Sequence, residues 1–200
     1  RRPDPRTAPA RAKAAGLYMI CTISKHRAER KGYADAMMLD WEGRVAECTG
    51  ANIFFIADGK IHTPTADCFL DGITRRTVID LARKRGIEVI ERRIMPDELS
   101  GFSECFITGT AAEVTPVSEI ADWRFVPGAI SKQLMDDYEA EVQPKGKGAA
   151  SLGCGDLKQT AHWHALKRFR FLKLFPPARG GLVIFLPRRD PCRAIRAFFM

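Results

Sequence analysis

Residues 44–63 read RVAECTGANIFFIADGKIHT, and this stretch decides the fold class. It contains three short apolar or alternating runs, at 44–46, 52–56 and 60–63, and each is typical of a β-strand. Asp58-Gly59 separates the last two runs, and this dipeptide favours the two positive φ angles of a type I′ turn. The sequence therefore predicts a tight β-hairpin.

Further strands and helices are predicted on both sides of this hairpin. Thr74–Arg85 has the clearest helical period, with an apolar face and Gly86 placed to end the helix. The other predicted helical segments are Lys13–Lys31, Pro96–Leu99 and Ser131–Val142, and the other predicted strands are Ala36–Leu39, Ile87–Ile94, Glu104–Thr108 and Glu113–Ile120. Because strands come in runs with helices interposed, we predict an α+β domain with a mixed or antiparallel sheet and flanking helices.

Composition excludes several classes of protein. Two hundred residues, 46% apolar and 28% charged, are typical of a soluble globular chain with one domain or two small ones. The longest apolar runs, such as Leu182–Leu186, have five residues and are far shorter than the roughly 20 residues of a membrane-spanning helix. Residues 1–6 are charged without an apolar core, unlike a secretory signal. The six cysteines form no C-x-x-C pair, so we expect reduced thiols, a cytoplasmic protein and no metal site.

The net charge of +8 is concentrated at one end of the chain. Residues 146–200 hold eleven Lys and Arg against two acids, whereas residues 1–145 hold 21 basic and 22 acidic groups. We predict a domain over 1–145 and an irregular basic tail over 146–200. The tail is interpreted either as frameshifted sequence or as a nucleic-acid or membrane-surface arm, with Lys167–Phe171 its best stretch. The apolar run Gly181–Pro187 does not suit a solvated arm, so we favour the first interpretation.

Two residues suggest covalent or proton chemistry. Lys13 stands among small residues that would let a planar group approach, and a buried lysine can become a nucleophile for Schiff-base chemistry. From spacing alone, a solvated lysine near a helix start is favoured. Glu47 ends a predicted strand beside a small-residue turn, where a carboxylate could hold a proton on a pyridine nitrogen. Taken alone, such a residue is more often a turn acid.

Two loops could bind an anion. Gly72-Ile73-Thr74 opens the strongest helix, so its free N–H groups and the Thr74 hydroxyl suit a phosphate. Gly109-Thr110-Ala111-Ala112 follows a predicted strand and supplies a second set of N–H donors. Each loop is weak evidence by itself. Arg75 stands in the first turn of the same helix, where side chains are commonly solvated, and we assign it no chemistry.

These residues together carry a family resemblance. The order of Glu47, Thr49, Asn52-Ile53-Phe54, Ile61, Thr63, Leu70, Gly72-Ile73 and Arg75 resembles the signature of class IV, fold-type IV aminotransferases that use pyridoxal phosphate. Residues 13–18, 32–40 and 109–117 are similar to branched-chain amino-acid aminotransferases in particular. The resemblance implies transamination between branched-chain amino acids and 2-oxoglutarate. D-amino-acid aminotransferase and aminodeoxychorismate lyase remain alternatives, as does an inactive truncated domain with a nucleic-acid-binding tail.

The resemblance also implies a role for each candidate site residue. Lys13 aligns with the family lysine that bonds the cofactor and moves a proton between the substrate α-carbon and the cofactor C4′. Tyr18 matches the tyrosine that binds the phenolic oxygen, and Glu47 matches the carboxylate paired with the pyridinium nitrogen. The other implied residues are the phosphate binders Ile73, Thr74 and Thr110 and, facing the substrate carboxylate, the amides of Thr110 and Ala111.

Family members carry a smaller domain ahead of this lysine, whereas only twelve residues precede Lys13 here. We therefore expect the chain to be the C-terminal cofactor-binding part of a longer protein. The resemblance implies that the full-length parent is a homo-oligomer. Its implied partners are an amino acid and a 2-oxo acid, with no membrane partner and no nucleic acid.

Overall fold

The computed structural model describes residues 1–143, 172–175 and 183–185. A two-stranded antiparallel pair consists of β1 (Met37–Leu39) and β2 (Val45–Cys48). The strands of the large sheet are β3 (Asn52–Ala57), β4 (Lys60–Pro64), β5 (Val89–Arg92), β6 (Glu104–Gly109), β7 (Glu113–Ile120), β8 (Trp123–Arg124), β9 (Leu172–Phe175) and β10 (Val183–Phe185). The helical segments are η1 (Ala15–Tyr18), α1 (Met19–Arg30), α2 (Ile73–Lys84), η2 (Pro96–Gly101) and α3 (Ala129–Val142).

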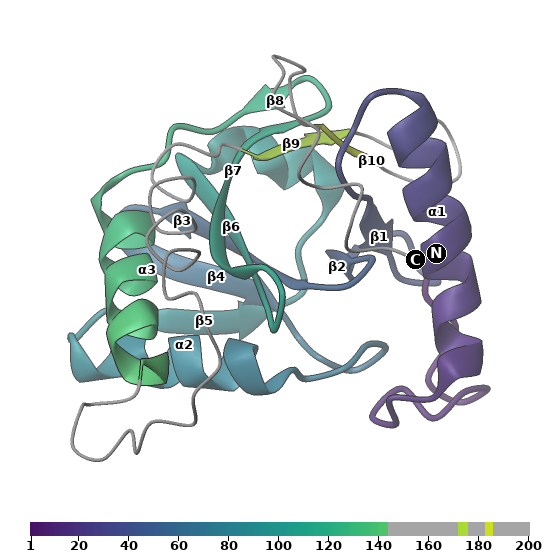
Figure 1. Ribbon diagram of the computed structural model, residues 1–200, viewed down its shortest axis with the longest axis horizontal. Helices are drawn as coiled ribbons and strands as arrows, with labels where there is room; N and C mark the ends of the chain where they lie inside the picture. Colours follow the sequence, from purple (N-terminus) through teal and green to yellow (C-terminus); the bar gives the residue numbers. More distant parts are fainter. Residues whose placement is uncertain (144–171, 176–182, 186–200) are drawn as a thin grey trace, which may run out of the picture.

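The large sheet is mixed and runs in the order β10-β9-β7-β6-β3-β4-β5, with β8 added to β7 (Figure 1). The pairs β4–β5 and β7–β9 are parallel, and the other pairs are antiparallel. The α+β class with a mixed sheet and flanking helices is confirmed. The strands β9 and β10 differ from the expectation of no strand after residue 146, and the rest of the predicted tail lies outside the described residues.

The predicted hairpin joins β3 to β4. Asp58 and Gly59 have φ angles of 50° and 72°, and Ala57 pairs directly with Lys60 across the turn. Two positive φ angles in a two-residue loop match the right-handed twist of the flanking strands. The hairpin is therefore confirmed by the feature that predicted it.

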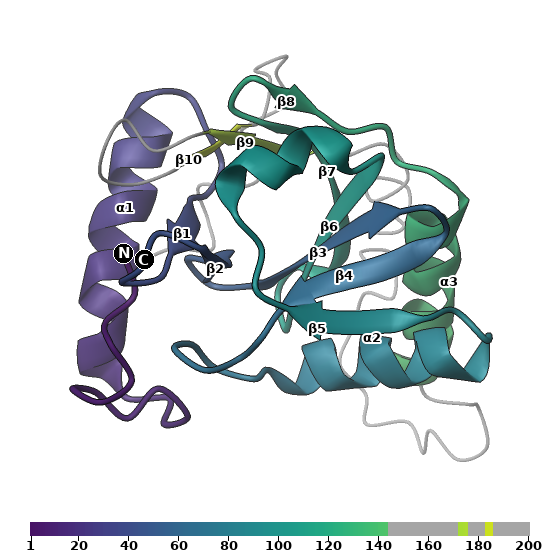
Figure 2. The ribbon, with the colours of Figure 1, turned by 180° about the vertical axis from the view of Figure 1, so that it is seen from behind.

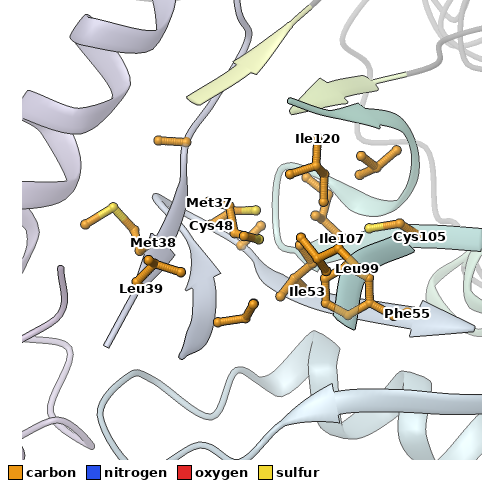
Figure 3. Close-up of a cluster of buried hydrophobic side chains, with 14 of the residues drawn as sticks. Met37, Met38, Leu39, Cys48, Ile53, Phe55, Leu99, Cys105, Ile107 and Ile120 are labelled. Atoms are coloured by element: carbon orange, nitrogen blue, oxygen red, sulfur yellow. The ribbon is translucent and has the colours of Figure 1, made fainter. Parts of the chain in front are cut away.

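The central strands separate two apolar clusters, because alternate residues of a strand point to opposite faces. Ile53 and Phe55 pack with β1, β2, α1 and η2 on one face (Figure 3). Phe54 faces the other side, where its ring stacks on Phe106 with centroids 4.8 Å apart, under α2 and α3. The two views of the ribbon show α2 and α3 on the opposite side of the sheet from α1 (Figure 2).

The helix ends confirm one local sequence prediction and correct another. Gly86 has a φ of 72° and its N–H donates to Arg83 O, so it ends α2 as expected. The helix predicted from Lys13 begins later, with a 3-10 turn at Ala15 and α-helix only from Met19. In the part of the chain that the structure describes, no helix is long and apolar enough to cross a membrane.

Candidate active site

Glu47 lies on β2 and is only 5% exposed. Its Oε1 atom is 3.2 Å from Nε of the buried Arg2, but the two do not align as a hydrogen bond. Burial raises the pKa of Glu47 to about 8, and the opposing charge of Arg2 only limits this rise. Glu47 is therefore a buried carboxyl group with an oxygen still able to bind a proton donor.

Arg2 connects Glu47 to the segment that carries Tyr18. Its backbone N–H donates to Leu39 O, its Nη1 donates to Leu17 O at 2.7 Å, and its guanidinium lies 5.6 Å from the centre of the Tyr18 ring. Burial raises the pKa of the Tyr18 hydroxyl, and the charge of Glu47 adds to this effect. The structure thus brings Tyr18 and Glu47 together around Arg2, a residue that the sequence offered only as part of a charged end.

Asp35 is a second, half-buried acid near Glu47. The Thr49 hydroxyl and the Ala36 N–H both donate to Asp35 Oδ1. Burial raises the pKa of Asp35, these hydrogen bonds oppose the rise, and its charge contributes to the raised pKa of Glu47. Sequence analysis missed Asp35, because only the fold places it beside a signature residue.

The two predicted anion loops begin at the same edge of the sheet. Asn52, the first residue of β3, pairs with Thr108 near the end of β6. The Asn52 amide donates to Leu70 O at 2.9 Å, and a Cβ on Gly72 would lie 2.6 Å from Asn52 Oδ1. Gly109 is also closely packed, since a Cβ there would lie 3.2 Å from Gly50 O. Asn52 therefore holds the start of α2 beside the loop that follows β6.

This edge carries unused hydrogen-bond donors. No side chain caps α2 at Gly72, and the first N–H groups of a helix have no acceptor within it. The Thr74 hydroxyl is nearly buried and lies 3.4 Å from the Tyr138 hydroxyl. The Thr108 hydroxyl is fully buried without a hydrogen-bond partner among the described residues. Ile73 is 77% exposed, and Thr110 and Ala111 are exposed.

Lys13 is exposed and lies just before η1. Among the described residues it has no hydrogen bond or ion pair, and the structure does not bring it into contact with Glu47. Its assigned role stays a prediction.

Arg75, which was expected to be solvated, is instead buried. The described residues contain no group of three His, Cys, Asp or Glu side chains that could hold a metal ion.

The class of this protein is shown by its similarity to known proteins. A family model described as amino-transferase class IV matches residues 1–120, and the chain belongs to this family. Its relatives include the branched-chain-amino-acid aminotransferase of Pseudomonas aeruginosa, 48% identical over 144 residues that make up 70% of this chain and 47% of the relative.

Solved structures agree with this assignment. The branched-chain aminotransferase of Thermoproteus uzoniensis with norvaline has a TM-score of 0.67 and 39% identity, covering 70% of this chain and 47% of that one. The PLP form of the enzyme from Thermobaculum terrenum has a TM-score of 0.66 and 40% identity, with the same coverage. The chain thus spans less than half the length of these relatives.

Proposed function

We propose that this chain is the cofactor-binding part of a branched-chain amino-acid transaminase that exchanges an amino group with 2-oxoglutarate by a ping-pong route. The buried Glu47 carboxyl carries this proposal, because its Oε1 atom has no hydrogen-bond partner in the described part of the chain and burial raises its pKa to about 8. A protonated ring nitrogen would supply the missing partner. The names of the relatives support the choice of substrates.

The residues of the chain fit pyridoxal phosphate at both ends. Glu47 would hold the proton on the ring nitrogen, and Tyr18 would bind the phenolic oxygen. When bound, the cofactor supplies an electron sink for the substrate α-carbon. Lys13 would bond the cofactor and move the proton at that carbon.

The phosphate would bind at the edge that Asn52 organises. Ile73 and Thr74 would donate their N–H groups from the start of α2, with help from the Thr110 hydroxyl. The amides of Thr110 and Ala111 would face the substrate carboxylate. These donors are free to bind because neither the helix nor the sheet uses them.

Borohydride reduction of the full 200-residue chain with pyridoxal phosphate tests the assignment of Lys13. We expect one phosphopyridoxyl group, located by peptide mass spectrometry on Lys13. Lys13→Ala should lose it, whereas Lys84→Ala, at the exposed C-terminal end of α2, should keep it. Labelling that persists in Lys13→Ala would remove this residue from its role.

The activity, substrates and homo-oligomeric state belong to the longer parent, so they are proposals for that protein. An assay of the parent with L-leucine, D-alanine and aminodeoxychorismate separates the three enzyme alternatives. Transfer from L-leucine to 2-oxoglutarate supports our choice, transfer from D-alanine supports a D-amino-acid enzyme, and release of pyruvate from aminodeoxychorismate supports the lyase. A cytoplasmic location is also proposed, in keeping with four free cysteines among the described residues.

We also retain the division into a domain over 1–145 and a basic tail over 146–200 as a proposal. Its support is that the family match ends at residue 120 and the Pseudomonas aeruginosa match covers 70% of the chain. If the tail were a nucleic-acid arm, the chain would bind DNA with a strong salt dependence, and deletion of 146–200 would abolish the binding. We expect no such binding.

A further inference from the structure

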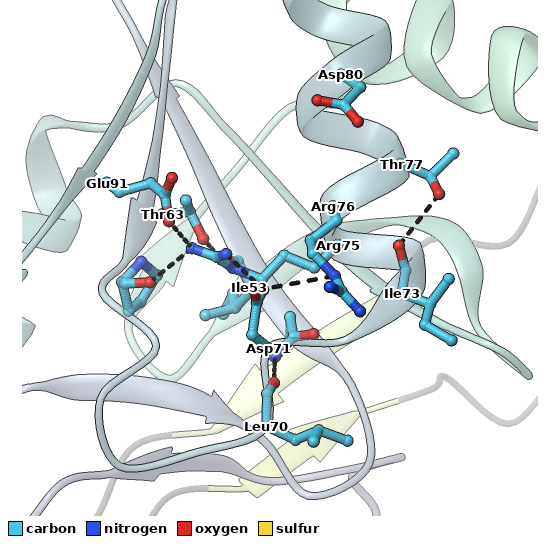
Figure 4. A network of polar contacts seen from close by, with 12 residues as sticks. Ile53, Thr63, Leu70, Asp71, Ile73, Arg75, Arg76, Thr77, Asp80 and Glu91 are labelled. Carbon is cyan, nitrogen blue, oxygen red and sulfur yellow. Dashed lines mark hydrogen bonds and ion pairs between the residues drawn. The ribbon is translucent and has the colours of Figure 1, made fainter. Parts of the chain in front are cut away.

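Arg75 lies in the first turn of α2, yet its side chain is only 2% exposed. Its Nη1 donates to Asp71 Oδ1 at 2.8 Å, and its Nη2 donates to Glu91 Oε2 at 2.7 Å and to Pro64 O at 3.1 Å (Figure 4). The Nε atom is buried and finds no hydrogen-bond partner among residues 1–143, 172–175 and 183–185. The expectation of a solvated side chain is wrong, because its partners lie on two strands and a loop that fold around it.

The three acceptors are attached to the framework around the start of α2. Pro64 ends β4, Glu91 lies on β5, and Asp71 immediately precedes Gly72. In the same segment, the Asn52 amide donates to Leu70 O. The segment that leads into α2 is therefore held to the sheet at two points, by Arg75 and by Asn52.

We propose that Arg75 is a positioning residue for the cofactor phosphate. It fixes the first N–H groups of α2, at Ile73 and Thr74, beside the loop that starts at Gly109. This inference rests on the proposed function, since it assigns a residue to the site where pyridoxal phosphate would bind. Arg75 does not itself contact the phosphate.

The geometry requires a guanidinium group at this position. The planar guanidinium donates from Nη1 to the Asp71 carboxylate and from Nη2 to both the Glu91 carboxylate and the Pro64 carbonyl. A lysine has only one nitrogen with which to reach these three acceptors. Arg76 provides a matched control, because it carries the same charge next to Arg75. Its side chain is 61% exposed and approaches Asp71 only to 3.9 Å. A general attraction for anions would involve both arginines, but positioning would involve only Arg75.

The test compares pyridoxal phosphate with pyridoxal, which lacks the phosphate, as ligands of the full chain. Dissociation constants are measured by absorbance, with circular dichroism confirming equal folding. We expect Arg75→Lys to weaken binding of pyridoxal phosphate about tenfold and that of pyridoxal by less than about twofold, since hydrogen bonds to a charged group are lost. The ³¹P resonance of the bound phosphate should also shift. Arg76→Ala should change none of these quantities.

Asp71→Asn is the milder variant, because the Asp71 side chain is 41% exposed and its loss leaves the other two contacts of Arg75 in place. Like Arg75→Lys, it should reduce the preference for pyridoxal phosphate over pyridoxal.

An Arg75→Lys protein that keeps the full preference would overturn the inference. Equal weakening of the binding of both ligands would also overturn it, because that result indicates a purely structural role. A wild-type chain that is labelled on Lys13 but shows no preference for the phosphate overturns this inference alone. A chain that binds neither ligand contradicts the proposed function as well.

Discussion

Glu47 and Arg2 are buried side by side, with Oε1 and Nε 3.2 Å apart, and neither atom has a hydrogen-bond partner among the described residues. The attraction between Arg2 and an ionised Glu47 therefore does not replace the hydrogen bonds that these two atoms would make with water. Glu47 consequently keeps a raised pKa, of about 8, beside a positive charge. A group that titrates so differently in the folded and unfolded chain makes stability depend on pH.

The cofactor-free chain should lose stability as the pH rises. Between the ordinary pKa of 4.5 and the folded value of about 8, the folded state keeps the Glu47 proton while the unfolded state has lost it. The contribution of Glu47 to the free energy of unfolding therefore falls through this range and levels off above it. Thermal midpoints across the range measure the slope. Glu47→Gln should flatten it, whereas the exposed Glu88→Gln should not. An unchanged slope in Glu47→Gln would assign the effect to other groups.

Asp35→Asn should lower the pKa of Glu47. The charge of Asp35 disfavours ionisation of Glu47, and the amide removes that charge. The titration of Glu47 should move to lower pH, as followed by carbon NMR of its carboxyl group and assigned with Glu47→Gln. Asp80→Asn, on an exposed part of α2, serves as the control. A titration that moves upward would contradict the arrangement of the two acids.

Gly72→Ala should distort the start of α2. Its Cβ would lie 2.6 Å from Asn52 Oδ1, so either Asn52 or the helix must move. We expect a loss of about 1–3 kcal/mol in the free energy of unfolding, the usual cost of an overpacked site. Gly101→Ala, whose Cβ would meet nothing within 4 Å, should be nearly neutral. Denaturant unfolding of both variants measures the difference, and equal stabilities would contradict the close contact.

Glu104 should be required for the start of α3. One oxygen of its carboxylate accepts hydrogen bonds from Gly128 N at 2.9 Å, Ser131 N at 3.0 Å and Ser131 Oγ at 2.6 Å. Glu104→Ala leaves these donors without an acceptor and should cost at least about 2 kcal/mol. Glu104→Gln keeps an acceptor oxygen and should cost less. Chemical denaturation compares the two, and a neutral Glu104→Ala variant would show that α3 begins without this cap.

Local features of the sequence predicted most of the sheet and α2. The hairpin at Asp58-Gly59 and the end of α2 at Gly86 depend on backbone conformations that neighbouring residues determine. The start of α1 was placed too early. The small residues around Lys13 permit a helix but supply no cap, and α-helix begins only at Met19.

The buried contacts of the charged residues could not be predicted from the sequence. Arg75 looked solvated because its contact Glu91 is sixteen residues away, and Arg2 looked like part of a charged end although it reaches Glu47. Such burial depends on which segments pack together, and no local pattern encodes that. The place of Glu47 at the end of a strand made it a candidate, but only the family signature gave it a role and marked Asn52.

The turn between β3 and β4 lies at the far end of the hairpin from the candidate site, because β3 begins and β4 ends at the edge held by Asn52 and Arg75. Asp58 and Gly59 are both exposed, and six strand residues at roughly 3.3 Å each separate the turn from Asn52 by about 20 Å. Exposed loop tips of this kind tolerate inserted sequence. A fluorescent reporter spliced between these two residues, or new chain termini made by circular permutation, would leave the loops that we propose for the cofactor phosphate intact.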